Sequence, residues 1–273
     1  MLETLRKHWP EYAIEAWALG TFMVSAALCT MLVEHPSSPV RAAIGNADLR
    51  RVLIGVCMGL TAICLIYSPW GKRSGAHMNP AVTLTFLRLG KVAHVDAFFY
   101  VLAQFTGGAL GVILVTALAG SAFTAPPVNS VVTLPAPPHG LGTAFVAESV
   151  IAFGMMTMIL VVSNSKLAPY TGLLAGALVA TYISLEGPFS GMSINPARSF
   201  ASAAPSGMWQ HLWIYFVAPP LGMLAAAQLY GWCNGHIACA KLLHPDNVRC
   251  IHCGYEPPAV ERARALIEER AHG

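Results

Sequence analysis

Two copies of the tripeptide Asn-Pro-Ala are the residues whose type and spacing point most directly to a function. They lie 116 positions apart in the chain (195 − 79). The six residues are Asn79, Pro80, Ala81, Asn195, Pro196 and Ala197. Asn is a favoured helix N-cap and Pro is favoured in the first turn, so each copy predicts the start of a helix. Each Asn amide has two N–H donors that could meet a passing oxygen atom.

Charged residues near these motifs add to the chemistry. Arg198 follows Asn195 by three positions and would bring a permanent positive charge with several donors. Glu15 and Glu148 lie in apolar runs, where a carboxylate is costly and functional by default. We expect a structural role for these two carboxylates rather than proton transfer. His77 should face a vestibule, where a structural role is favoured over a pH gate.

The C-terminal tail holds a second group of reactive residues. Cys239, His244, Cys250 and Cys253 are close in sequence, and Cys250-x-x-Cys253 has the spacing of a metal knuckle. On a cytoplasmic side disulfides are disfavoured. The tail is therefore either a small zinc site or a reduced segment without metal, and no other cofactor is expected.

Composition indicates an integral membrane protein. The 273 residues are 55% hydrophobic and only 11% charged, whereas soluble domains carry about 25% charged residues. No charged residue occurs in 97–147 or in 199–240. The net charge of +3 is small and spread out, so no nucleic-acid partner is expected.

Six apolar segments are long enough to cross a bilayer, which needs about 20 residues per helix. They cover about 13–33, 52–67, 95–118, 141–162, 167–185 and 212–233. The two Asn-Pro-Ala helices are too short to cross, because Arg88 and Pro205 soon follow them, and they read as re-entrant half-helices. Three spans with one half-helix thus occur twice, about 11–120 and 140–235, which predicts an inverted repeat in a channel domain 1–235.

The distribution of Lys and Arg favours cytoplasmic termini and a cytoplasmic tail, 236–273. Arg41, Arg50 and Arg51 run against this, because they lie in the first outer loop. Half-helices entering from opposite faces would bring their N-termini together near mid-bilayer, each with about half a positive charge. Such a site suits a neutral solute and repels cations.

The paired motifs, with Ser-Gly-Ala-His before the first and Arg-Ser-Phe after the second, resemble the aquaporin (major intrinsic protein) family over about 11–235. The resemblance implies an all-α, right-handed bundle of six transmembrane helices plus two re-entrant half-helices. It also implies a homotetramer in the cell membrane, with one pore per subunit. Each pore would pass water, with small neutral solutes as a further option, while excluding protons and ions. Glutamates at the positions of Glu15 and Glu148 would anchor the re-entrant loops by accepting hydrogen bonds from their backbone N–H groups.

Family members narrow at a ring of four residues near the outer mouth. The positions that match it are Met58, Ile183, Met192 and Arg198. This ring lacks the aromatic residue and the histidine usual in water-selective members. Glycerol-conducting relatives usually have Asp after the arginine and Pro-Leu in the last span, where this chain has Ser199 and Tyr215-Phe216. These markers favour water as the main permeant.

Two other functions stay open on the sequence. A glycerol or small-solute facilitator fits the broad apolar ring. A secondary transporter also uses inverted repeats and broken helices, with Glu15 and Glu148 as candidate coupling groups. An enzyme is not expected, because the spans contain no nucleophile–base pair and no cofactor loop.

Overall fold

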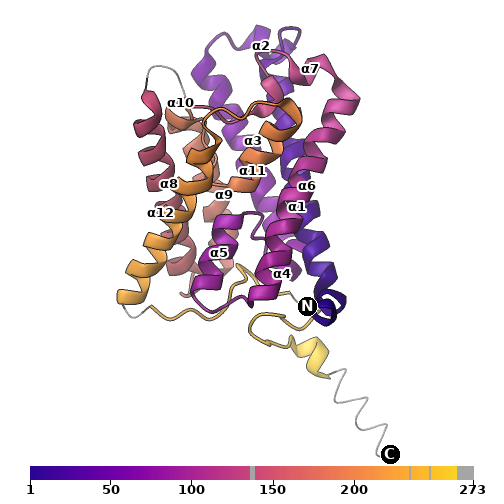
Figure 1. Ribbon diagram of the computed structural model, residues 1–273, viewed down its shortest axis with the longest axis vertical. Helices are drawn as coiled ribbons and strands as arrows, with labels where there is room; N and C mark the ends of the chain where they lie inside the picture. Colours follow the sequence, from indigo (N-terminus) through magenta and orange to yellow (C-terminus); the bar gives the residue numbers. More distant parts are fainter. Residues whose placement is uncertain (136–138, 234, 246, 263–273) are drawn as a thin grey trace, which may run out of the picture.

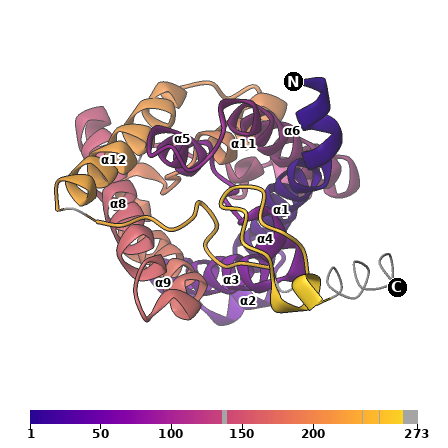
Figure 2. The same cartoon turned by 90° about the horizontal axis from the view of Figure 1, so that it is seen from below.

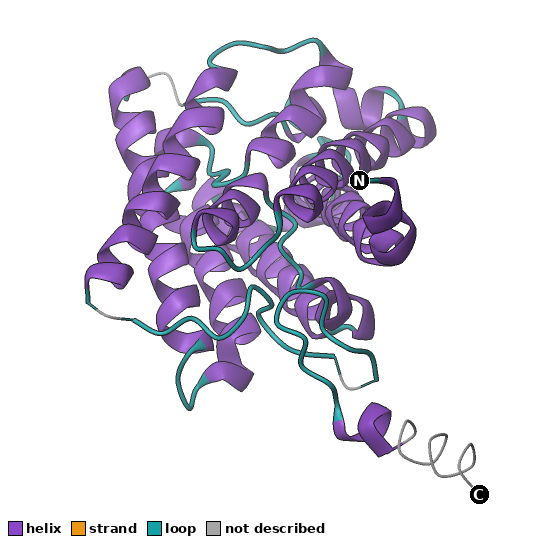
Figure 3. Ribbon diagram, turned by 60° about the horizontal axis from the view of Figure 1, so that its bottom comes forward, coloured by secondary structure: helices purple, strands orange, loops and turns teal. Residues whose placement is uncertain are grey.

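The computed structural model describes residues 1–135, 139–233, 235–245 and 247–262, and within these ranges it contains helices and loops without strands (Figure 3). Six helices in the described part are long and apolar enough to cross a membrane. They are α1 (Leu2–Glu34), α3 (Ala47–Tyr67), α6 (His94–Ala119), α8 (Gly140–Ser163), α9 (Thr171–Leu185) and α12 (Leu212–Trp232). Each overlaps one predicted span, and the fifth reaches the needed length together with the turn that precedes α9, as Ala168–Leu185.

The first helix is longer than predicted, because α1 begins at Leu2 rather than near residue 13. The polar residues before the predicted span form a largely exposed first stretch of the same helix. There the Lys7 Nζ donates to the Glu3 Oε1 at 2.8 Å, a pair with the spacing that favours helix. Pro10 lies inside α1 without ending it.

The two half-helices are α5 (Pro80–Arg88) and α11 (Pro196–Ser206). Each is preceded by a short helix and an extended stretch, α4 (Pro69–Ser74) and α10 (Gly187–Ser190). In Figure 1, α5 lies in the lower half of the bundle and α11 in the upper half. They enter from opposite ends, as the inverted repeat predicts. The smaller elements are α2 (Pro39–Ala43), α7 (Ser121–Thr124), η1 (Asn129–Val131) and η2 (Ala168–Tyr170).

Close helix crossings occur at equivalent glycines of the two halves. Helix α1 packs on α6, and α8 packs on α12. A Cβ at Gly107 would lie 2.0 Å from the Ala16 carbonyl oxygen, and one at Gly222 would lie 2.2 Å from that of Ser149. Real Cβ atoms do not approach so closely, so only glycine lets these backbones touch. The crossings set the frame that holds the half-helices.

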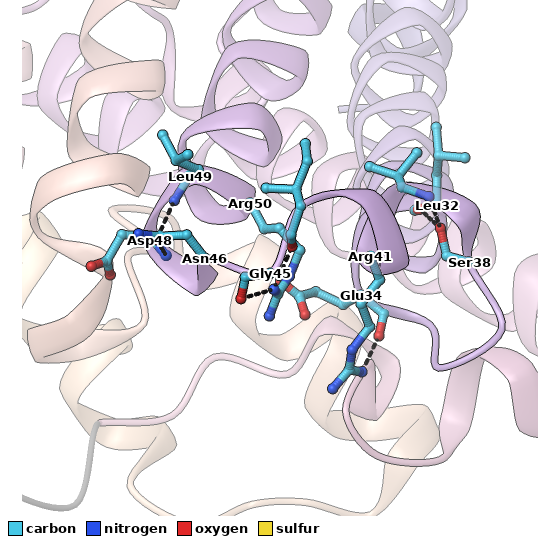
Figure 4. A network of polar contacts seen from close by, with 11 residues as sticks. Leu32, Glu34, Ser38, Arg41, Gly45, Asn46, Asp48, Leu49 and Arg50 are labelled. Carbon is cyan, nitrogen blue, oxygen red and sulfur yellow. Dashed lines mark hydrogen bonds and ion pairs between the residues drawn. The ribbon is translucent and has the colours of Figure 1, made fainter.

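The arginines in and next to the loop between α1 and α3 take part in a network of polar contacts (Figure 4). Arg50 makes an ion pair with Glu34 at 3.0 Å and donates to the carbonyls of Ile44 and Gly45. Arg41 donates to the Glu34 carbonyl. Arg51 pairs with Asp48 at 2.7 Å. Each guanidinium has protein partners, so these charges fasten the loop, and the Arg51 Nε also joins it to α9 by donating to the Ser184 carbonyl at 3.0 Å.

The N-terminus of α1 and the tail after α12 lie at the same end of the bundle, which we call the terminal end (Figure 1). Seen from below, the tail runs from α12 across this end toward α4 (Figure 2). Tail residues Ile237, Ala240 and Leu242 are buried in one apolar cluster with Ala76, Val82 and Phe86. The tail is therefore packed on the channel domain.

Candidate functional site

The two Asn-Pro-Ala motifs are hydrogen-bonded to each other's loops. The Asn79 Oδ1 caps α5 by accepting from the Ala81 N–H at 2.8 Å, and the Asn195 Oδ1 caps α11 by accepting from Ala197 and Arg198. The Asn79 Nδ2 donates to the Ile194 carbonyl, and the Asn195 Nδ2 donates to the Met78 carbonyl, both at 2.7 Å.

These bonds amend one expectation from the sequence. Each Asn was expected to offer two amide donors to a solute, but one of them already holds the opposite loop. A single N–H of each amide is thus left for a passing oxygen atom.

Glu15 anchors the first re-entrant loop from within α1. Its carboxylate accepts from the Ser74 hydroxyl at 2.7 Å, from the His77 and Met78 N–H groups at 3.0 and 2.7 Å, and from the Gln104 amide at 2.8 Å. The side chain is fully buried. Four donors therefore compensate the cost of burying this charge.

Glu148 does the same for the second loop from within α8. It accepts from the Ser190 hydroxyl and from the Ser193 and Ile194 N–H groups, each at 2.7 Å. Ser190, Ser193 and Ile194 stand 116 positions after the partners of Glu15, the same offset as the two motifs. The expected loop-anchoring role matches these contacts.

Both loops use the same unusual backbone. Ala76 and Met78 have φ of 52° and 49°, and Met192 and Ile194 have 49° and 50°. Non-glycine residues rarely adopt this left-handed region, which costs of order 1–3 kcal/mol per residue. The buried carboxylates stabilise it by taking the loop N–H groups, so the loop shape depends on the two glutamates.

A cavity of about 340 Å³ runs past both motifs. Its polar lining residues are Thr30, His77, Asn79, Ser193, Asn195 and Arg198. Apolar side chains line the rest, including the predicted ring residues Met58, Ile183 and Met192. The four residues matched to the ring thus come from α3, α9, the second loop and α11 to face one cavity.

Arg198 is fixed by a segment whose role the sequence did not reveal. Its Nη1 donates to the Val131 carbonyl at 2.9 Å and to the Thr133 hydroxyl. Val128, Val131 and Val132 also line the cavity. In the sequence this proline-rich stretch lies between two spans, and its numerous turn residues carry no signal for what it contacts.

His77 lines the cavity near the terminal end but is only 4% exposed. Its Nδ1 lies 3.0 Å from the Thr83 hydroxyl, and its Nε2 lies 2.9 Å from the Ala240 carbonyl oxygen. The ring stacks against His252 at 6.2 Å between centroids. The expected vestibule position is therefore covered by the tail, which also places Leu242 in the cavity lining.

The four tail residues predicted as metal ligands are brought together. The ligand atoms of Cys239, His244, Cys250 and Cys253 all lie within 4.8 Å of one another. They come from a tail in which no long helix positions them.

Six spans in two inverted halves, with capped half-helices that meet at one cavity, define a channel-type membrane protein. The chain belongs to the major intrinsic protein family, whose sequence model matches residues 6–230. It is 34% identical over 245 residues to the probable aquaporin AqpM of Archaeoglobus fulgidus, covering 85% of this chain and 98% of that protein. It is 34% identical over 217 residues to aquaporin NIP2-2 of Zea mays, covering 78% and 71%.

The solved structure of the aquaglyceroporin from Plasmodium falciparum has the same fold. The TM-score is 0.68 at 21% sequence identity, with 82% of this chain and 95% of that chain covered. The predicted family and fold are thereby confirmed. The tail after residue 230 lies outside the family match.

Proposed function

We propose that the protein is a passive channel for water that excludes protons and other ions. The observation that carries the proposal is one cavity lined by Asn79, Asn195 and Arg198, with the N-termini of both half-helices at its centre. Each N-terminus carries about +0.5 elementary charge, and Arg198 adds a full one. Cations are therefore repelled, while a neutral molecule that accepts hydrogen bonds finds two amide donors.

The ring of Met58, Ile183, Met192 and Arg198 is proposed as the selectivity filter. Three members are apolar, so Arg198 is its sole hydrogen-bonding side chain. Methionine is flexible and adapts to different shapes. This composition supports a second candidate function, a facilitator of glycerol or similar neutral solutes, which the same filter would pass if the methionines move aside.

The terminal end is proposed to be cytoplasmic. Lys72, Arg73, Arg88 and Lys91 belong to the half of the bundle that holds α4 and α5, in agreement with the positive-inside rule (Figure 1). The arginines of the first outer loop, which run against this rule, each have hydrogen-bond partners within the protein. Assembly as a homotetramer in the cell membrane, and the absence of enzymatic activity, are proposed from membership of the family.

The test is stopped-flow shrinkage of liposomes under sucrose and under glycerol gradients. A matched pair of variants controls it: Ile183→Trp fills the cavity, whereas Leu185→Trp changes a side chain that is 69% exposed on the same helix. We expect fast water flow in the wild type and in Leu185→Trp, and flow near that of empty liposomes in Ile183→Trp. Equal flow in wild-type and empty liposomes, with metal added or chelated, would refute the channel.

A further inference from the structure

The geometry points to a metal site that nothing in the channel function requires. We propose that Cys239, His244, Cys250 and Cys253 bind one zinc ion, and that the ion fastens the tail over the terminal end of the passage. The ion would be structural and would act on the position of the tail.

The spacing of the ligand atoms fits a tetrahedral ion. The Cys239 and Cys250 sulfurs are 3.6 Å apart, and the His244 Nε2 lies 3.2 Å from the Cys253 sulfur. A tetrahedron with the usual Zn–S length of about 2.3 Å places its sulfurs about 3.8 Å apart. A disulfide needs about 2.05 Å. The cluster thus has the separation of metal ligands rather than of a bond.

The donor types select the class of metal. Three thiolates and one imidazole are soft and intermediate ligands, which favour zinc over calcium or magnesium. A four-ligand site without an open position is typical of structural zinc. No substrate could then be activated on the ion.

The backbone around the ligands supports the same interpretation. The Lys241 N–H donates to the Cys239 sulfur at 3.4 Å, an outer contact of the kind that stabilises a thiolate ligand. In the Cys-x-x-Cys turn, Cys250 N–H donates to the Tyr255 carbonyl at 2.8 Å and Gly254 N–H to the Cys250 carbonyl at 3.0 Å. Gly254 has φ of 75°, which glycine adopts without strain.

The residues between the ligands make the contacts with the passage. Cys239 and His244 flank Ala240, whose carbonyl meets His77, and Leu242, which lines the cavity. Cys250 and Cys253 flank His252, which stacks on His77. Each pair of ligands therefore brackets a contact with the same re-entrant loop.

Lys241 shows how closely the tail fits. It is 4% exposed and its Nζ donates to the Arg73 carbonyl. A Cβ at Gly75 would lie 2.9 Å from the Lys241 Cγ, so the glycine makes room for it. Residues 239–245 form loops rather than long helices. Ordering such a segment costs conformational entropy. Zinc binding would offset this cost, because the binding free energy stabilises the ordered tail.

The first test measures metal in the full-length protein, purified in detergent without added metal. We expect about one zinc ion per chain, and a loss of about tenfold or more in Cys250→Ser/Cys253→Ser. The control Cys64→Ser/Cys233→Ser removes two exposed cysteines outside the cluster and should keep the zinc. Cobalt(II) should give the absorption bands of a tetrahedral thiolate site in the wild type and the control alone.

Absence of zinc and of the cobalt spectrum in the wild type would overturn the site, as would a Cys239–Cys250 disulfide in the mass of the tail peptide.

The second test asks whether the ion holds the tail. Chelation should speed tryptic cleavage after Lys241 and raise water flow several-fold in wild-type liposomes, without effect on the zinc-free variant. Bound zinc with unchanged cleavage and flow on chelation would overturn the fastening role. Metal content is measured without reference to water flow, so a failure of the zinc site can be told apart from a failure of the proposed channel.

Discussion

His77 and Ser193 occupy equivalent positions in the two re-entrant loops, yet they bond in different directions. The Ser193 hydroxyl contacts Ser199 at 2.6 Å within its own half. The His77 ring contacts Thr83, at the position equivalent to Ser199, and also reaches outward to Ala240 of the tail. The first loop is therefore coupled to the tail, whereas the second contacts the segment after α7, where Ser199 meets the Thr133 hydroxyl at 3.4 Å.

The half-helices also differ at the position that lines the cavity three residues after each Asn. Arg198 of α11 corresponds to Val82 of α5, which is buried in the apolar cluster beneath the tail. The anchoring carboxylates, the asparagine caps and the left-handed residues recur in both halves. The repeated contacts therefore build the passage. The unmatched pairs, His77 with Ser193 and Val82 with Arg198, make its two ends chemically different.

The largest effect should come from removing the anchors. Each oxygen of Glu15 accepts from one backbone N–H and one side chain, so the NH2 group of Glu15→Gln opposes a fixed N–H and also forces the Ser74 hydroxyl or the Gln104 amide to turn and accept. One oxygen of Glu148 accepts from Ile194 alone, so Glu148→Gln opposes one. We expect the unfolding free energy to fall by about 3 kcal/mol and about 1–2 kcal/mol respectively.

Thermal unfolding in detergent, followed by tryptophan fluorescence, measures the order of the two variants. Glu3→Gln on the exposed start of α1 is the control and should leave the midpoint unchanged. Equal losses in both halves would show that the fourth donor on Glu15, from Gln104, contributes nothing. Counting from the paired Tyr100 and Tyr215, Gln104 corresponds to Pro219, which has no such donor.

Arg198→Val makes the second half-helix resemble the first. The filter loses its positive charge and becomes wider, so we expect glycerol flow to rise several-fold and a cation leak to appear, while water flow is kept. Liposomes loaded with a pH-sensitive dye and assayed in parallel for glycerol swelling report both effects. Unchanged selectivity would mean that Arg198 does not control the narrowest point.

A smaller change in the same direction is expected for Thr133→Val, which keeps the side-chain shape and removes one acceptor from Arg198. The Val131 carbonyl still holds the guanidinium, so the loss is about 1 kcal/mol of positioning. Glycerol flow should rise less than in Arg198→Val, in the same swelling assay. A rise as large as that of Arg198→Val would make Thr133 a filter residue in its own right.

The smallest effect is expected for His77→Ser, which gives the first loop the residue of the second. Losing the bond to Ala240 should weaken tail docking by about 1 kcal/mol and moderately speed tryptic cleavage after Lys241. Ser193→Ala, the corresponding change in the other half, should not affect cleavage. If both variants accelerate it equally, the coupling of the tail to the first loop is wrong.

Local signals account for what the sequence predicted well. The apolar runs give the spans, and Asn followed by Pro gives the starts of α5 and α11. The loop anchors were also within reach, since a carboxylate inside an apolar span needs partners. The start of α1 was misplaced, because its charged first turns look like a loop when their solvent exposure is unknown.

Contacts between distant segments could not be predicted in this way. Nothing in the sequence ties Val131 and Thr133 to Arg198, because a carbonyl and a hydroxyl are available almost everywhere. The position of the tail depends on Gly75 and Lys241 fitting together, a matter of shape. The resemblance to the family gave no help there, since the tail lies outside the matched residues.

The reciprocal bonds between Asn79, Asn195 and the opposite loops have a mechanical consequence. Neither half can move relative to the other without breaking these two hydrogen bonds, so the middle of the passage is held rigid. Any regulation of flow has to act near an opening, and at the terminal end that opening is where the tail with its proposed zinc site rests.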